Sequence, residues 1–196
     1  ALTTLQLANE VHQPLSDEET QNALQAVRLE QGVSKQMVLL NASRAVATKV
    51  LEGCTFVTNR EGRVKNINDA EGSHLYSPRL RDGGLSLANA GALALLGARS
   101  SPLPTTCMQT DWRGSAGDGP AVVVVDDDAV PFVRKGRNVF HGFVRACDPW
   151  LNPGEACLIT DLNGTLLGHG VAQCTSGELG CFTKGIAVKT RGGFDS

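Results

Sequence analysis

The chain has 196 residues, of which 41% are hydrophobic and only 5% aromatic, so it can bury a sizeable and mostly aliphatic core. The formal net charge of -2 at pH 7 excludes a bulk electrostatic attraction to nucleic acid, so such a partner must meet a local basic patch. No apolar run approaches the ~20 residues of a membrane span, and the N-terminus lacks a signal-peptide pattern. The sequence therefore predicts no association with a membrane.

The cysteines are scattered and do not have the spacing of a metal site. They form no C-x-x-C pair, and no histidine lies at ligand spacing from them, which argues against a zinc finger or ribbon. We expect neither a metal nor another cofactor, and we interpret the cysteines as buried thiols of a protein in the reducing cytoplasm. The six residues are Cys54, Cys107, Cys147, Cys157, Cys174 and Cys181.

The N-terminal part of the chain begins with helical patterns. A capping box at Ser16 to Glu19 predicts a helix that continues to about Glu30. Ser34 to Leu51 carries an apolar stripe at helical spacing, which predicts a second helix. Together these patterns predict a helical hairpin, and the stripe is more typical of a core than of a binding site.

Gly53 is expected to end the second helix, and strand patterns follow it. The sequence CTFVTNREGRVKNIN alternates around Asn59 to Gly62, and this predicts a β-hairpin with basic residues on or beside its turn. The segment from His74 to Leu96 predicts a second strand pair or a strand with a short helix. A turn is expected at Arg81 to Gly84.

These patterns predict a small α+β unit over residues 1–96. Residues 97–119 are rich in Gly, Pro, Ser and Thr without an apolar period, so we interpret them as an exposed linker between separate cores. The GSAGDG run at residues 114–119 lacks the lysine and the following helix of a phosphate-binding P-loop. A second domain is expected over residues 120–196.

The second domain contains five short strand patterns and two short helical ones. We expect strands at Ala121 to Val125, at Asn138 to Ala146, on both sides of a two-residue Asn163-Gly164 turn, and at Ile186 to Thr190. Helical turns are expected at 129–135 and 177–183. This pattern predicts a small closed β-barrel, and the fold class of the whole chain is α+β.

A basic cluster lies where the first helix of this barrel joins its next strand. Arg134, Lys135 and Arg137 surround Gly136, and Arg145 follows without an intervening acidic residue. A glycine lets a phosphate backbone approach closely, and arginines can donate two hydrogen bonds to phosphate oxygens. The cluster is a candidate nucleic-acid contact, and the alternative is a solvated helix end whose cations complement the helix dipole.

The run AVVVVDDDAVPFVRKGRNVFHGFVRACDPWLNPGEACLITDLNGTLLGHGVAQC with FTKGIAVKTRGG resembles a PUA domain, an RNA-binding pseudobarrel. It is most similar to the PUA domain that ends the archaeal tRNA-guanine transglycosylase family. The matching patterns are V-D-x-x-A-x-x-F-x-R-x-G-x-x-V-F-x-x-F-V and K-G-x-A-V-K-x-R-x-G. Weaker similarity covers the two preceding segments, with departures at Leu29 to Lys35 and in the long linker.

This resemblance implies that the chain is the non-catalytic C-terminal half of such an enzyme. The family's catalytic barrel, with its paired aspartates and cysteine-rich zinc site, has no counterpart in this sequence, so no catalytic residue is predicted. The implied function is to hold tRNA for guanine exchange on the way to archaeosine, beside a catalytic transglycosylase subunit. The predicted RNA-binding residues are Arg134, Lys135, Gly136, Arg137, Asn138, Phe140, Arg145, Lys184, Lys189 and Arg191.

Two other classes of function remain as alternatives. An autonomous enzyme is disfavoured because the sequence has no G-x-S-x-G, H-E-x-x-H or P-loop motif, and because His141 and His169 have the surroundings of structural histidines. A protein-interaction scaffold, or an accessory factor of ribosome biogenesis or translation with a PUA domain, is compatible with the near-neutral charge. Titration with tRNA at two salt concentrations discriminates between RNA binding and a scaffold.

Overall fold

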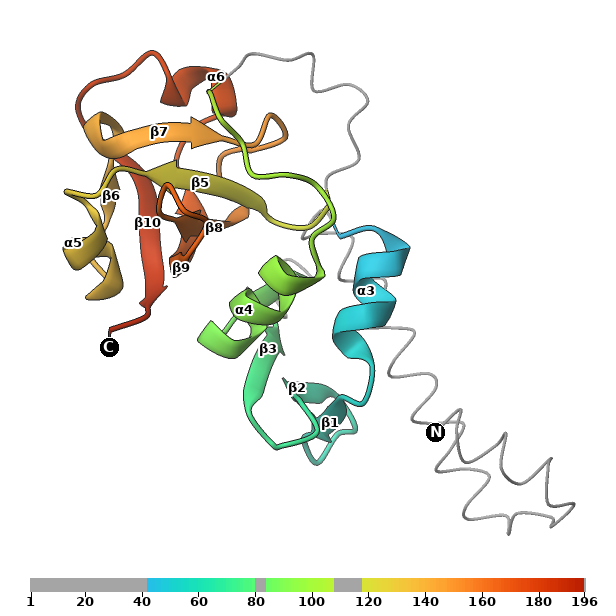
Figure 1. Cartoon of the computed structure of the whole chain (residues 1–196). Coiled ribbons are helices and arrows are strands. Elements are labelled where there is room, and N and C mark those ends of the chain that lie inside the picture. Colours follow the sequence, from blue (N-terminus) through green and yellow to red (C-terminus); the bar gives the residue numbers. More distant parts are fainter. Residues whose placement is uncertain (1–41, 80–83, 108–117, 196) are drawn as a thin grey trace, which may run out of the picture.

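The computed structural model describes residues 42–79, 84–107 and 118–195 (Figure 1). These residues form a four-stranded sheet with two helices, followed by a six-stranded sheet that curves into a barrel. The predicted helix from Ser16 and the predicted turn at Arg81 to Gly84 lie wholly or largely outside the described residues. The α+β class expected from the sequence is confirmed.

The first unit is an antiparallel meander with the strand order β1-β2-β3-β4. Its elements are α3 (Arg44–Leu51), β1 (Thr55–Thr58), β2 (Val64–Asn68), β3 (His74–Pro78), β4 (Leu85–Leu87) and α4 (Asn89–Ala98). Opposed side chains along the ladder, from Phe56 through Ile67 and Tyr76 to Leu87, share the face on which the helices pack. This face supplies the core of the unit.

Local sequence signals fix the ends of several of these elements. Ser43 caps α3 by accepting a hydrogen bond from the amide of Val46, and Gly53 follows the helix with φ 71°. Residues 34–41 of the expected second helix lie outside the described residues, and α3 begins only after the cap at Ser43. The predicted β1–β2 hairpin is confirmed, because the Asn59 side chain accepts from the amides of Glu61 and Arg63 at 3.0 Å.

The second unit is a nearly closed barrel with the strand order β6-β10-β9-β8-β5-β7. Neighbouring strands are antiparallel except β5 and β8. Its elements are β5 (Ala121–Val125), α5 (Val130–Arg134), β6 (Val139–Phe140), the 3-10 turn η2 (His141–Phe143), β7 (Val144–Cys147), β8 (Ala156–Thr160), β9 (Leu166–Ala172), α6 (Ser176–Leu179) and β10 (Ile186–Gly193).

Two local predictions for the barrel are wrong. The strand expected from Asn138 to Ala146 is split by η2, because β6 pairs with β10 whereas β7 pairs with β5 at the other end of the sheet. The hairpin at Asn163-Gly164 has a three-residue loop, since the amide of Asp161 bonds to the carbonyl of Thr165. The Asp161 side chain orders this loop by accepting from two of its amides.

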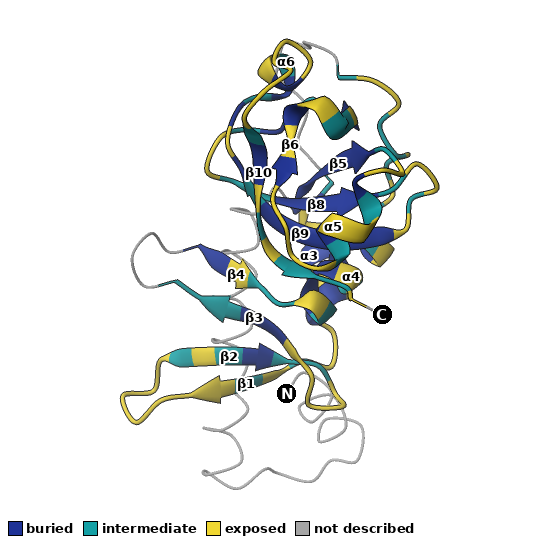
Figure 2. Ribbon diagram, turned by 90° about the vertical axis from the view of Figure 1, so that its left-hand side faces the viewer, coloured by how far each residue is buried: buried dark blue, intermediate teal, exposed yellow. Residues whose placement is uncertain are grey.

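Each unit has a core cluster of its own, and a third buried cluster joins the two units. All five residues of β5 are buried, because Val123 and Val125 face the barrel interior whereas Val122 and Val124 face outward. The outward pair packs against α4 of the first unit, which lies between the two sheets in Figure 1. Figure 2 shows the resulting continuous burial of β5, β8 and β9.

The described part of the expected linker also packs against the barrel. Leu103 joins the shared cluster, and Cys107 packs against the barrel core. Asp118 accepts a hydrogen bond from the amide of Ser101 at 3.0 Å, which closes the segment on itself. These residues are therefore not a free tether, whereas the domain boundaries at residues 97 and 119 remain a prediction.

Five of the six cysteines are at least partly shielded, and none of the six forms a disulfide. Burial raises the pKa of the Cys157 thiol to about 12, so this thiol stays protonated at neutral pH. Cys181 is exposed, contrary to the expectation that all of these thiols are buried.

Candidate nucleic-acid interface

The basic cluster predicted from the sequence lies on a tightly closed helix end. Gly136 has φ 75° and donates to the carbonyl of Val133 at 2.9 Å, while the amide of Arg137 donates to the carbonyl of Phe132 at 3.0 Å. This pair of bonds is a Schellman motif, which ends α5 and satisfies its last carbonyl groups. The prediction that Gly136 closes the helix in the left-handed conformation is confirmed.

Strand β10 holds this loop from the other side. Thr190 donates through its hydroxyl to the carbonyl of Arg137 at 2.8 Å, and through its amide to Oδ1 of Asn138 at 3.2 Å. Gly193 lies directly beneath the loop, where an added Cβ would overlap the carbonyl of Arg134. The loop therefore has a fixed position on the barrel, and Thr190 and Gly193 support the candidate site although the sequence analysis did not select them.

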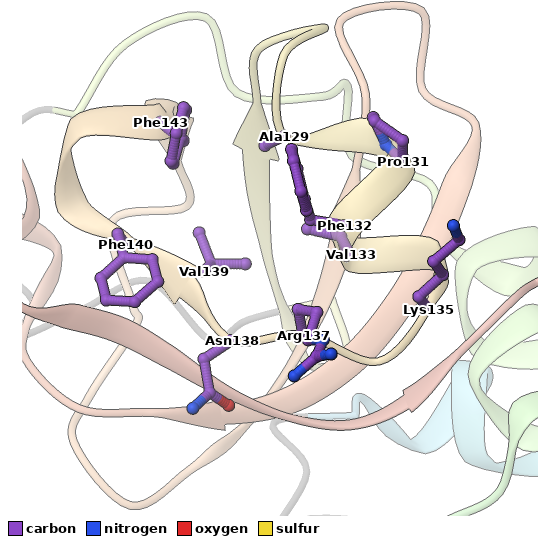
Figure 3. A pocket seen from close by; sticks show the side chains of 10 residues that line it. All are labelled: Ala129, Pro131, Phe132, Val133, Lys135, Arg137, Asn138, Val139, Phe140 and Phe143. Atoms are coloured by element: carbon purple, nitrogen blue, oxygen red, sulfur yellow. The ribbon is translucent and has the colours of Figure 1, made fainter.

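An apolar pocket of about 590 Å³ opens beside the loop (Figure 3). Figure 3 shows Phe132 on α5 and Phe140 on β6 around this pocket, with Val139 between them. The two phenylalanines are 59% and 48% exposed, which is unusual for aromatic side chains of this size. The pocket is lined by Ala129, Pro131, Phe132, Val133, Lys135, Arg137, Asn138, Val139, Phe140 and Phe143.

Four of the predicted RNA-binding side chains line this pocket: Lys135, Arg137, Asn138 and Phe140. The Lys135 and Arg137 side chains form no ion pair within the described residues, so both cations are available at the rim. Arg134 is half-buried, and its Nε is buried without a hydrogen-bond partner in the described part of the chain.

The other predicted cations lie away from the pocket. Arg145 forms an ion pair with Asp126 at 2.6 Å, because the acidic run after β5 lies beside β7. Lys184 is exposed in the connection before β10, whereas Lys189 and Arg191 are exposed on β10 itself. The structure thus groups the residues around Gly136 and separates them from the remaining predicted cations.

Phe132 and Phe143 are pocket residues that the sequence analysis did not select. Both have apolar side chains in segments expected to be buried, so their pattern resembles that of core residues. The only feature of the sequence that could have indicated them is the presence of three phenylalanines within residues 132–143, around the basic cluster. Aromatic faces combined with cations form the surface on which proteins stack unpaired bases.

Two other kinds of feature, a metal-binding cluster and a membrane-spanning helix, were sought among the described residues. No three His, Cys, Asp or Glu side chains there are grouped so that they could hold a metal ion. None of the helices in the described ranges combines the length and apolarity needed to cross a bilayer.

Comparison with known proteins agrees with the architecture. Residues 121–194 match the family described as PUA domain, so the barrel is a PUA domain. The chain is a relative of archaeal tRNA-guanine transglycosylases over the region that includes this domain, and the resemblance predicted from the sequence is confirmed.

The similarity covers most of this chain but a small part of those enzymes. The tRNA-guanine(15) transglycosylase of Thermococcus onnurineus is 38% identical over 139 residues, which are 71% of this chain and 21% of the enzyme. That of Methanocaldococcus jannaschii is 36% identical over 67% of this chain and 18% of the enzyme. The chain thus spans about a fifth of the length of these relatives.

A solved structure shares the fold of both units. A hypothetical protein from Pyrococcus horikoshii superposes with a TM-score of 0.58, covering 84% of this chain and 90% of that protein at 19% identity. The similarity extends beyond the PUA domain, so the arrangement of the first unit and the barrel also occurs in another protein.

Proposed function

We propose that the chain is an RNA-binding module that holds tRNA for a modifying enzyme. The observation that carries this proposal is the apolar pocket between Phe132 and Phe140, with Lys135 and Arg137 at its rim. An unpaired base stacks on the exposed phenylalanines, while the two cations bind the adjoining phosphates. The PUA domain and the tRNA-guanine transglycosylase relatives support this choice of ligand.

The geometry favours an unpaired end of the RNA over a duplex. The pocket has room for a base, and a base must leave the stack to present its face to an aromatic side chain. The left-handed turn at Gly136 exposes backbone without a side chain, so a phosphate can approach next to Arg137. Contacts of this kind position the strand and carry little sequence specificity.

We propose further that the chain is not catalytic by itself. The pocket is lined by cations, amides and apolar groups, and no carboxylate is among its lining residues to act as nucleophile or base. The exchange of guanine would require a catalytic transglycosylase part, which acts on the tRNA that this chain holds. The purified chain is therefore expected to leave the guanine of tRNA in place until such a part is added.

The test is a titration with a tRNA transcript at two salt concentrations. Phe132→Ala and Phe140→Ala are each expected to lower tRNA affinity by about 1–3 kcal/mol, as for the loss of one base stack. Leu162→Ala is the matched control, since Leu162 is a similarly exposed apolar residue at 56% on the β8–β9 loop, outside the lining of the pocket. Its affinity should equal that of the parent chain.

Two results would contradict the proposal. If the parent chain does not bind tRNA at either salt concentration, the function is that of a protein scaffold. If all three apolar variants bind equally well, the pocket does not hold a base.

A further inference from the structure

Two cysteines far apart in the sequence lie opposite each other where the segment that joins the two units meets the barrel. Cys107 and Cys147 form an isolated parallel β-bridge, and the amide of Cys147 donates to the carbonyl of Thr106 at 3.4 Å. In Figure 1 the coil that follows α4 runs up beside β7 toward α6. Cys107 is half-buried there, whereas Cys147 is buried at the end of β7.

The backbone places these two side chains at the separation that a disulfide bond requires. Paired residues of neighbouring strands lie about 4.7–4.9 Å apart, and disulfides join Cα atoms that are roughly 4.4–6.8 Å apart. Burial raises the pKa of Cys107, and a hydrogen bond between the two thiols opposes this rise, so the thiols are in contact. A Cβ added to Gly180 would lie 3.3 Å from Cβ of Cys107, so the chain after α6 packs against this cysteine.

The residue after Cys147 already binds the other end of the same segment. Arg99 donates to both carboxylate oxygens of Asp148 at 2.7 and 2.8 Å, and Cys107 lies at the opposite end of residues 99–107. Two consecutive residues of the barrel thus hold both ends of this segment, one through an ion pair and one through a thiol contact. A bond between the two cysteines would make the second attachment covalent.

A cavity gives small molecules access to the pair. It has a volume of about 300 Å³, and Thr106, Cys147 and Trp150 are among the residues that line it. Cys174 is a third thiol nearby, because it adds to the effect of burial in raising the pKa of Cys147. No backbone pairing among the described residues joins Cys174 to either member of the pair.

We propose that Cys107 and Cys147 are a redox-active pair that hydrogen peroxide converts to a disulfide, which ties the segment between the units to the barrel. This inference goes beyond the proposed function and does not depend on RNA binding. Cytosolic disulfides in mesophiles are usually transient and often sense oxidants. The pair would therefore record oxidation as a change in the stability of the chain.

The reaction has two steps, and Cys107 reacts first because it is the more exposed thiol. Its thiolate attacks one oxygen of the peroxide, the O–O bond breaks, and a sulfenic acid forms while hydroxide leaves and takes up the proton of the original thiol. The Cys147 sulfur then attacks the Cys107 sulfur, and the S–O bond breaks. The Cys147 proton leaves with the hydroxyl group as water, so two thiols lose two electrons and one peroxide becomes two waters.

The rate of this reaction should rise with pH. Only a thiolate attacks peroxide, and burial raises the pKa of both thiols, so the thiolate fraction is small at neutral pH. Below the pKa of Cys107 this fraction grows about tenfold for each pH unit, and we expect the rate to follow it between pH 7 and 8. A rate that does not change with pH would exclude Cys107 as the attacking group.

The experiment treats the folded chain with hydrogen peroxide and maps the cross-links by mass spectrometry of unreduced peptides. Cys181→Ser is the starting chain, because the exposed Cys181 thiol could link two chains. Cleavage after arginine and glutamate isolates Cys147 from the later cysteines, since Arg145 and Glu155 flank it, and places Cys107 on another peptide. A covalent pair of these two peptides is the expected product.

Melting curves give a second measurement on the same chains. The oxidised chain should melt about 5–10 °C above the reduced chain, because the disulfide closes a long loop of the unfolded chain, and dithiothreitol should reverse the rise. Cys107→Ser should abolish both the cross-link and the rise. Cys174→Ser is the matched control, which removes the third thiol and should keep both effects.

The cross-link map decides the inference even where a variant fails to fold. A link from Cys107 to Cys174, or oxidation of Cys107 without any link to Cys147, would show that the proposed pair is wrong. A Cys107–Cys147 link without a rise in melting temperature would overturn the proposed effect on stability. None of these measurements includes tRNA, so their failure and the failure of the proposed function are distinguishable.

Discussion

Arg99 and Asp148 form a buried bidentate ion pair across 49 residues of the chain, with N–O distances of 2.7 and 2.8 Å. Their side chains are only 5% and 3% exposed. Oδ2 of Asp148 also accepts from the amide of Val122 at 2.7 Å, and the Arg99 guanidinium lies 5.4 Å from the Trp150 ring centre. This network attaches the residues after α4 to the start of the barrel.

Removing either partner of this ion pair should lower the stability of the folded chain. Arg99→Ala or Asp148→Ala is expected to lower the free energy of unfolding by about 3–5 kcal/mol, because either change leaves a buried charge without its partner. Arg145→Ala is the control, since its pair with Asp126 involves an arginine side chain that is 52% exposed and should contribute about 0–1 kcal/mol. Urea denaturation measures all three values. Equal losses for Arg99→Ala and Arg145→Ala would show that the buried pair has no special role.

Gly136→Val should destabilise the barrel through its backbone alone. A Cβ at this glycine would meet no atom within 4 Å, so the cost arises from φ 75°, which a β-branched residue adopts with difficulty. The expected loss is about 1–2 kcal/mol or more. Gly97→Ala is a contrasting variant, because Gly97 lies in α4 with open space around it and should gain roughly 0.5–1 kcal/mol. Thermal melting measures whether Gly136→Val lowers and Gly97→Ala raises the stability. An unchanged melting temperature for Gly136→Val would mean that the loop adopts another conformation without loss of stability.

The cations around Gly136 should contribute to RNA affinity and little to stability. Arg137→Ala and Lys135→Ala are expected to weaken binding of all tRNAs similarly and to reduce the salt slope by about one each. Melting temperatures should stay within about a few degrees of the parent, since exposed cations at a helix end contribute only ~0.3–1 kcal/mol. Arg145→Ala should affect binding less, because Asp126 already neutralises Arg145. Unchanged affinity in the first two variants would leave the loop as an ordinary helix end.

His169 should make the folded chain less stable in mild acid. Burial lowers the pKa of His169 below its ordinary value, so the unfolded chain binds a proton at this residue more readily than the folded one. Stability is therefore unaffected at pH 8 and falls as the pH decreases through about 6.5, the ordinary histidine value. Urea denaturation at pH 7.5 and 5.5 should show a smaller difference for His169→Gln than for the parent. If the stability of both chains falls equally between pH 7.5 and 5.5, groups other than His169 cause the loss in acid.

The sequence by itself determined the features that depend on neighbouring residues. Gly136 ends α5 in the conformation that its position predicted, and the hairpin around Asn59 follows from its side-chain bonds to nearby amides. The apolar run of β5 and the pattern around it also identified the PUA domain. These signals are local because each depends on backbone preferences over a few residues.

The tertiary structure decided the features that depend on distant partners. The apolar sequence of β5 does not indicate that α4 covers its outer side. The separation of β6 from β7 depends on their different partners, because β6 pairs with β10 and β7 pairs with β5. Arg99 and Asp148 can form their ion pair only when α4 packs on the barrel. Phe132 has the pattern of a core residue, yet the loop held by β10 leaves it exposed beside the cations. The pocket is lined by α5, β6 and the residues around them, and β10 fixes the loop that joins α5 to β6.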